Sequence, residues 1–232
     1  MTTVRRGTKV PARWRLLVCG LTLLASCSQE PLTAADPHAD MPVPKRSGHT
    51  GSFTSKSVNG IEAPLRLELK ATVRADLSDV LAFYRVELGK RGWQEMPEGA
   101  VVDAEHAQLA FASPKGPATL KLGRAKDETT INLVQRNTDA AAKADVLPKP
   151  GQARLIFGFL APDVASLVIN DQTIKIAGGV NHPQMLDLPP GTYSYGLLLS
   201  GHRVRSDTIT VAAGETWSLR LDNDDKKSDQ IY

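Results

Sequence analysis

From Pro64 to Leu221, apolar side chains recur at every second position in many short runs, and this alternation constrains the fold more than any other feature of the sequence. The run "PLRLELKATVR", residues 64–74, is typical, because its leucine, alanine and valine residues alternate with mostly polar or charged ones. Such a period is typical of strands that bury one face and leave the other in solvent. The chain is therefore predicted to be rich in antiparallel sheet.

One stretch has a helical period instead. Between Leu77 and Leu88 the apolar residues are spaced three and four apart, which predicts an amphipathic helix. Asp76 can cap its start, and Gly92 can close its end. Alternating runs follow at residues 93–96, 106–113, 118–124 and 129–136. We therefore expect residues 61–136 to form a small antiparallel sheet with one helix on one face.

The helical stretch also carries a resemblance. Residues 83–88, "FYRVEL", followed by Gly92-Trp93, resemble the helix of small βα-meander domains that are found in bacterial envelope proteins. The resemblance implies a fold for this segment and no particular activity.

A second region, residues 153–223, contains seven short β-rich runs divided by Pro, Gly and Asn-Asp turns, which predicts an all-β sandwich. The fold class expected for the whole chain is thus α+β. Residues 188–193, "LPPGTY", and 211–216, "VAAGET", resemble PEGA-type surface modules, which usually act as adhesive or spacer domains. An Ala- and Pro-rich linker is expected at residues 137–152, and a frayed polar tail at 224–232.

The first 26 residues are predicted to be a signal peptide. Five basic residues precede an apolar run, Leu16 to Ser26, that is roughly half the ~20 residues needed to span a membrane. The residues Leu24-Ala25-Ser26-Cys27 resemble the lipobox of bacterial lipoproteins. The resemblance implies that Cys27 carries a diacylglycerol, that the chain is cut before Cys27, and that a fatty acyl chain such as palmitate is added to the new N-terminus. The alternative is an ordinary cleaved signal with an incidental cysteine.

This interpretation places the protein in the cell envelope, anchored by lipid to the membrane, and we expect the periplasmic side of the outer membrane because Ser28 follows the cysteine. Residues 27–60 contain four prolines and no apolar period, so they are predicted to be a flexible tether. Removal of residues 1–26 takes five basic and no acidic residues from the 28 basic and 25 acidic ones, which leaves a net charge of −2. A nucleic-acid partner is therefore not expected.

No catalytic residue, cofactor or metal site is predicted from the motifs. The weak candidates for binding are Asn181 and His182, in a glycine-containing loop, and Arg203 and Arg205, which could contact an anionic glycan from one strand. The alternatives are a wide turn for the first pair and a strand edge protected by charge for the second.

The sequence therefore favours a non-enzymatic envelope lipoprotein that acts as a tethered interaction or scaffold module. Its expected partners are the membrane, through the lipid anchor, and either an envelope protein or a cell-wall polymer. The alternative is an envelope hydrolase or glycan-binding protein whose site forms no recognisable motif.

Overall fold

The computed structural model describes residues 33–34, 41–45, 50–57, 62–158, 165–169, 172–176, 184–220 and 228–232. Residues 32–232 belong to one compact unit. Among the described residues, none of the helices combines the length and the apolar character that crossing a membrane requires.

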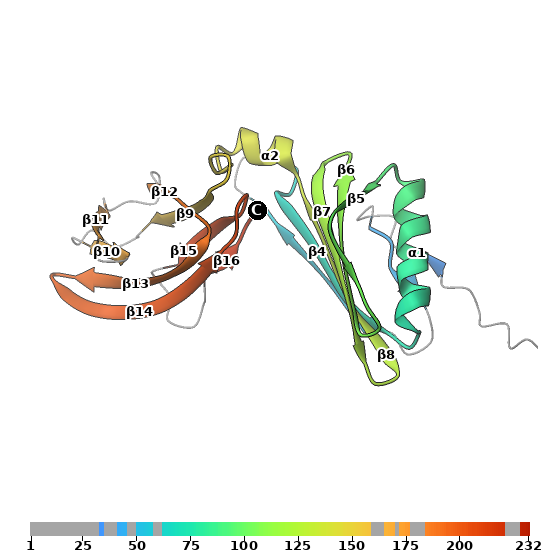
Figure 1. Cartoon of the computed structure of the whole chain (residues 1–232). Coiled ribbons are helices and arrows are strands. Elements are labelled where there is room, and N and C mark those ends of the chain that lie inside the picture. The colour runs from blue at the N-terminus through green and yellow to red at the C-terminus, as the bar shows by residue number, and fades with distance from the viewer. Residues whose placement is uncertain are drawn as a thin grey trace, which may run out of the picture. The chain divides into compact units, whose positions relative to one another are not determined.

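The first part of this unit is a six-stranded antiparallel sheet with one long helix, α1 (Leu77–Lys90), along one face (Figure 1). A separate two-stranded pair joins β1 (Thr33–Ala34) and β2 (Pro44–Lys45). The strands of the larger sheet lie in the order β3 (Thr50–Lys56), β4 (Arg66–Val73), β8 (Glu128–Arg136), β7 (Gly116–Ala125), β6 (His106–Ser113) and β5 (Gln94–Val102).

The helix α1 forms where the sequence predicts it. Asp76 occupies the N-cap position without a side-chain capping bond, and its carboxylate lies 3.5 Å from Nη1 of Arg124 instead. Gly92 follows the helix with a φ of +75°, a conformation that other residues rarely adopt. Tyr84 and Leu88 are fully buried, and the apolar face of α1 forms one core cluster with the inward residues of β4, β6, β7 and β8.

The second part is a β-sandwich, as expected. One sheet has the order β12 (Gln184–Leu188), β9 (Ala153–Gly158), β15 (Thr216–Arg220) and β16 (Asp229–Gln230), and the other has β11 (Gln172–Ile176), β10 (Ala165–Ile169), β13 (Gly191–Leu199) and β14 (His202–Val211). The strands β9 and β15 are parallel, and the remaining pairs are antiparallel. Buried residues of both sheets, such as Phe157 and Leu197, form a single core cluster. The α+β fold class is thus confirmed.

The strand after α1 is longer than predicted. Trp93 is buried just before β5, but every side chain of β5 itself is exposed. The register with β6 shifts between Met96 and Val101. Because β5 lies at the edge of the sheet, its side chains need no apolar alternation, and the sequence therefore did not reveal its length.

The linker expected at residues 137–152 contains a short helix, α2 (Thr138–Lys143). The side chain of Asn137 accepts a hydrogen bond of 3.0 Å from the backbone N–H of Ala140, which caps the helix. Alanine has the highest helix propensity, so the Ala-rich composition that suggested a linker also favours this helix. Ala141 and Val146 are buried.

The prediction of a flexible tether over residues 27–60 is wrong for residues 50–56. Thr50–Lys56 forms β3 and pairs along its whole length with β4. Met41 is only 1 % exposed and belongs to the same core cluster as α1. An edge strand is held by backbone hydrogen bonds, so "TGSFTSK" joins the sheet although it lacks an apolar period.

The prediction of a frayed tail over residues 224–232 is also wrong for residues 228–232, which the structure describes. Asp229–Gln230 forms β16 against β15, and Lys56 makes a 2.6 Å ion pair with Asp229. Tyr232 is 5 % exposed and packs in a small apolar cluster with Leu65 and Val146. A single buried aromatic ring can order a polar segment, and composition alone does not reveal this. The independence of the two predicted domains stays a prediction.

Candidate functional site: a groove on the open face of the sheet

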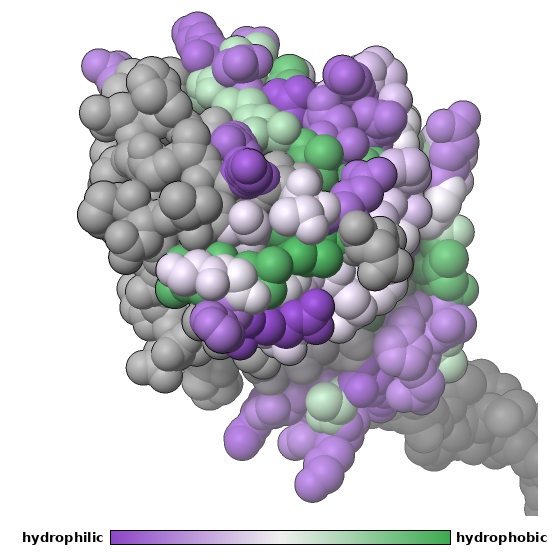
Figure 2. Space-filling model, turned by 90° about the vertical axis from the view of Figure 1, so that its left-hand side faces the viewer, coloured by the Kyte–Doolittle hydropathy of each residue, from purple (hydrophilic) through white to green (hydrophobic). Residues whose placement is uncertain are grey.

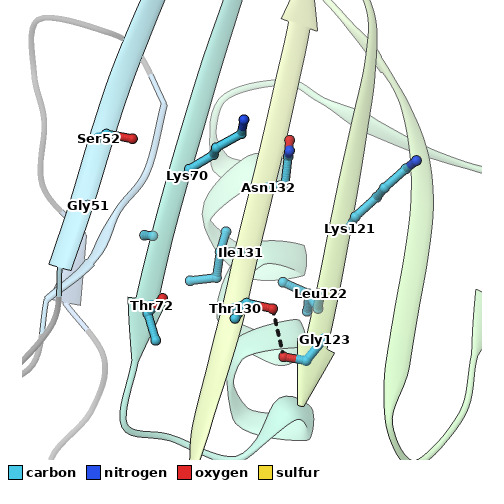
Figure 3. Close-up of a pocket in the computed structure, with 11 residues that line it drawn as sticks. Gly51, Ser52, Lys70, Thr72, Lys121, Leu122, Gly123, Thr130, Ile131 and Asn132 are labelled. Carbon is cyan, nitrogen blue, oxygen red and sulfur yellow. Dashed lines mark hydrogen bonds between the residues drawn. The ribbon is translucent and has the colours of Figure 1, made fainter. Parts of the chain in front are cut away.

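The two faces of the six-stranded sheet carry different side chains, because successive residues of β4 and its neighbours point to opposite sides of the sheet. On β4, Leu69 and Ala71 belong to the core that packs beneath α1. Lys70 lies between them and Thr72 follows Ala71, so both point to the opposite side of the sheet. We call the side of the sheet that is opposite α1 the open face, and Figure 3 shows it with the helix behind the strands.

A row of polar side chains crosses four strands of the open face. The register places Ser52 of β3 opposite Lys70 of β4, Lys70 opposite Asn132 of β8, and Asn132 opposite Lys121 of β7. These side chains point to the same side of the sheet (Figure 3). Neighbouring strands are about 4.8 Å apart, so the backbones of the two lysines are separated by about 10 Å.

A second row, one pleat further along, carries small groups. Thr72 of β4 lies opposite Thr130 of β8, which lies opposite Gly123 of β7. The hydroxyl of Thr130 donates a hydrogen bond of 3.0 Å to the carbonyl of Gly123 (Figure 3). A Cβ atom at residue 123 would lie 3.0 Å from the Thr130 hydroxyl oxygen, so the glycine keeps this part of the face low.

The two rows enclose a groove of about 640 Å³, which we call the open-face groove. Its lining contains two lysines and neither a carboxylate nor an aromatic ring. The lining residues are Gly51, Ser52, Lys70, Ala71, Thr72, Lys121, Leu122, Gly123, Thr130, Ile131 and Asn132.

One carboxylate lies directly beside the groove. Glu68 accepts a 3.0 Å hydrogen bond from Arg66 and another of 3.0 Å from the Asn132 amide, and the ammonium of Lys70 lies 3.3 Å away. Burial raises the pKa of Glu68, but the hydrogen bonds from Arg66, Asn132 and Lys70 outweigh it, so its pKa lies below the ordinary value. Lys121 makes no ion pair with any residue that the structure describes. The groove therefore carries an excess of positive charge.

The groups that line the groove can bind a ligand more readily than they can transform it. The Thr130 hydroxyl donates to a backbone carbonyl, and the Asn132 amide donates to Glu68. In the described parts of the chain, no three His, Cys, Asp or Glu side chains gather into a group that could hold a metal ion. Ammonium, amide and hydroxyl groups on a rigid sheet are suited to anions and polyols.

Of the residues singled out in the sequence, Arg203 lies exposed on β14. It lines a smaller hollow of about 480 Å³ together with Tyr195 and Asp207. The register of β13 and β14 shifts here, so that Leu198 lies opposite Arg203 but Leu197 lies opposite Arg205. The shift places an irregularity between the two arginine positions of β14.

The side of the molecule that Figure 2 shows carries apolar and polar side chains close together. Three of the predicted positions lie outside the described residues: Cys27, Asn181 and His182. The role of the predicted binding residues therefore stays a prediction.

The open-face groove was not among the sites predicted from the sequence. Its signal is present as the polar half of each alternation, at Lys70 on β4, Lys121 on β7 and Asn132 on β8. Charged residues at such positions ordinarily face solvent without a role. Only the strand register shows that these three lie in one row.

The chain matches no model of a known protein family. A search of curated proteins likewise finds no match.

Proposed function

We propose that this chain is a non-enzymatic lipoprotein of the bacterial cell envelope, whose open-face groove binds an envelope protein or a cell-wall polymer. The observation that carries the binding role is the cross-strand row of Ser52, Lys70, Asn132 and Lys121, which gathers donor groups from four strands beside a hollow. Convergence of polar groups on a rigid element is a general feature of binding sites.

The rigidity of the site supports the proposal. The strands β4, β8 and β7 bury their other face against α1, with Leu69, Leu120 and Leu133 almost completely excluded from solvent. Side chains on such strands are held in fixed positions, so little conformational entropy is lost when a ligand binds.

The lipid anchor is the second part of the proposal, and the sequence around Cys27 supports it. The basic residues, the short apolar run and the lipobox-like residues 24–27 together favour export and lipidation. Two or three acyl chains hold a protein on a membrane stably, whereas a single chain gives only marginal binding. The groove would then stay close to the membrane, within the reach of the predicted tether.

Fatty-acid labelling tests the anchor. We expect wild-type protein to incorporate labelled palmitate and to fractionate with membranes, and Cys27→Ala to lose the label and accumulate as uncleaved precursor. Cys19→Ala, which changes the other cysteine of the chain, serves as the matched control and keeps the label. Undiminished labelling and membrane association of Cys27→Ala would contradict the anchor.

Site-specific photo-crosslinking in cells tests the binding role. A photoreactive residue replaces Thr72 in the groove, and the same residue replaces Val86, which is 55 % exposed on α1, as the control. We expect an adduct from position 72 and a weaker one or none from position 86. Equal adducts from both positions, or none from position 72, would argue against binding at the groove.

A further inference from the structure

We infer that the occupant of the open-face groove is an anionic carbohydrate polymer, whose carboxylate or phosphate groups pair with Lys70 and Lys121 and whose hydroxyls contact Ser52, Thr130 and Asn132. This inference rests on the proposed binding role of the groove and adds to it the chemical class of the ligand.

The charge of the groove supports an anion. Two lysines and no acid line it, and the carboxylate next to it, Glu68, is already shared by Arg66 and Lys70. The side chain of Lys70 is 62 % exposed, so its ammonium can turn from Glu68 toward a ligand. Lys121, for which the described residues offer no ion-pair partner, is the stronger site for a negative group.

The separation of the two lysines supports a polymer. Their backbones stand about 10 Å apart across three strands, so a single small anion cannot contact both at hydrogen-bond distance unless both side chains bend inward. A chain with repeated negative groups can contact Lys70 and Lys121 at the same time, and the second contact then forms at a high effective concentration.

The remaining lining distinguishes a glycan from a peptide. The groove lies on the face of the sheet, where the backbone groups of β4, β8 and β7 are already paired with one another, so an added peptide strand finds no free ladder there. Apart from the two lysines, the side chains that face the groove are polar and small. Hydroxyl and amide groups match the hydroxyls of a sugar.

The absence of aromatic rings from the lining makes the charge essential. Neutral sugars commonly gain affinity from apolar and aromatic surfaces, and the groove lining offers no ring for stacking. A glycan without charge therefore has few sources of affinity here, whereas charge-assisted hydrogen bonds to lysine are roughly twice as strong as neutral ones.

The experiment measures binding of the full chain, purified in detergent, to four immobilised polymers. These are polygalacturonate, which carries carboxylates, a glycerol-phosphate polymer, uncharged dextran, and polyglutamate as an acidic peptide. We expect binding to one or both of the first two, and the one that binds identifies the anionic group. No binding to either, or binding to dextran or polyglutamate that is as tight, would overturn the inference.

Substitutions then assign the contacts. We expect Lys121→Ala to raise the dissociation constant about tenfold and Lys70→Ala about threefold, because Lys70 already interacts with Glu68. Lys115→Ala removes an exposed lysine from the turn between β6 and β7, outside the groove, and serves as the matched control. Equal effects of Lys115→Ala and Lys121→Ala would show unspecific attraction to charge and would contradict a site in the groove.

Gly123→Val tests the shape of the site without changing its charge. The added side chain begins 3.0 Å from the Thr130 hydroxyl and projects into the groove, so we expect a loss of binding of at least tenfold. An unfolding curve like that of the wild type confirms that the variant folds. Unchanged binding by folded Gly123→Val would place the ligand elsewhere.

The inference and the proposed function can fail separately. If Thr72 is crosslinked to a partner in cells but neither anionic glycan binds, the groove is a binding site for another class of ligand and the inference alone is wrong. If position 72 gives no adduct and neither anionic glycan binds, both are wrong.

Discussion

Replacement of Trp93 by alanine provides a sharp test of how the first core is built. Trp93 is 4 % exposed and contacts Phe111 edge to face, with ring centroids 6.2 Å apart and an interplanar angle of 64°. Its Nε1 atom is buried and has no hydrogen-bond partner among the described residues, so the substitution removes packing and no hydrogen bond. The expected loss in the free energy of unfolding is about 3–5 kcal/mol.

Urea denaturation followed by circular dichroism measures this loss. With a slope of roughly 2 kcal/mol per molar urea, the midpoint is expected to fall by about 2 M. Trp93→Phe is the matched control, because it keeps an aromatic ring beside Phe111 and is expected to cost about 1–2 kcal/mol. If the midpoint for Trp93→Ala falls by less than the midpoint for Trp93→Phe, Trp93 does not fill the core as argued.

The same variant also tests whether the two predicted domains are independent. In the mature chain proposed above, Trp217 is then the remaining tryptophan, and its fluorescence reports on the sandwich. Independent domains predict that the fluorescence transition of Trp93→Ala stays where Trp93→Phe has it. A fluorescence transition that falls together with the circular dichroism would show that the apolar cluster around Tyr232 couples the two parts.

Three further predictions concern other contacts. Trp217 is only partly buried, and its Nε1 donates a 2.9 Å hydrogen bond to Glu215. In urea denaturation, Trp217→Ala should lower the free energy of unfolding by about 2 kcal/mol, which is less than the loss for Trp93→Ala. Tyr232→Ala should lower the free energy of unfolding by about 3–5 kcal/mol, because it removes a buried ring. Tyr232→Phe loses only a 3.2 Å contact with the Thr138 hydroxyl and should lower it by about 1 kcal/mol. Equal losses would contradict burial of the ring. Folding lowers the pKa of Glu68, so its carboxylate stabilises the folded state above the unfolded pKa of 4.5, and this stabilisation is lost as pH falls through the folded pKa. Glu68→Gln should therefore lose less stability in acid than wild type does.

The elements that the sequence predicted are those with a strong apolar period. The strand β4 and the helix α1 each bury one face, and burial of apolar area is the largest favourable term in folding, so the residues that are buried mark these elements directly. The strand β9 follows the same rule and buries Ala153, Leu155 and Phe157, and turn residues separate the seven strands β9 to β15.

The elements that were missed bury little of their own surface. The strand β3 lies at an edge of the sheet, and its residues Gly51–Lys56 are exposed or only half-buried. The strand β16 depends on two backbone pairings and on the ring of Tyr232. Their order comes from contacts with residues far away in the sequence, and no local pattern records such contacts.

The open-face groove was beyond sequence analysis for a related reason. Lys70, Lys121 and Asn132 are each ordinary polar residues on the solvent side of a strand. Their alignment follows from the register of β4, β8 and β7, and a shift of one residue in any of these pairings would turn the side chains of that strand to the other face. The buried leucines behind the row fix the register, so the core determines the arrangement of the site without contributing a ligand contact.

This division between core and groove makes the binding hypothesis separable from stability. Lys121 is exposed and Lys70 is 62 % exposed, so truncation of either should change the free energy of unfolding by no more than about 0.5 kcal/mol. The residues directly behind them, such as Leu120 and Leu133, are completely buried and would destabilise the sheet by about 2–5 kcal/mol if truncated. A lysine variant that loses binding and keeps its unfolding midpoint therefore reports on the ligand contact, whereas a loss of binding that accompanies unfolding reports only on the sheet.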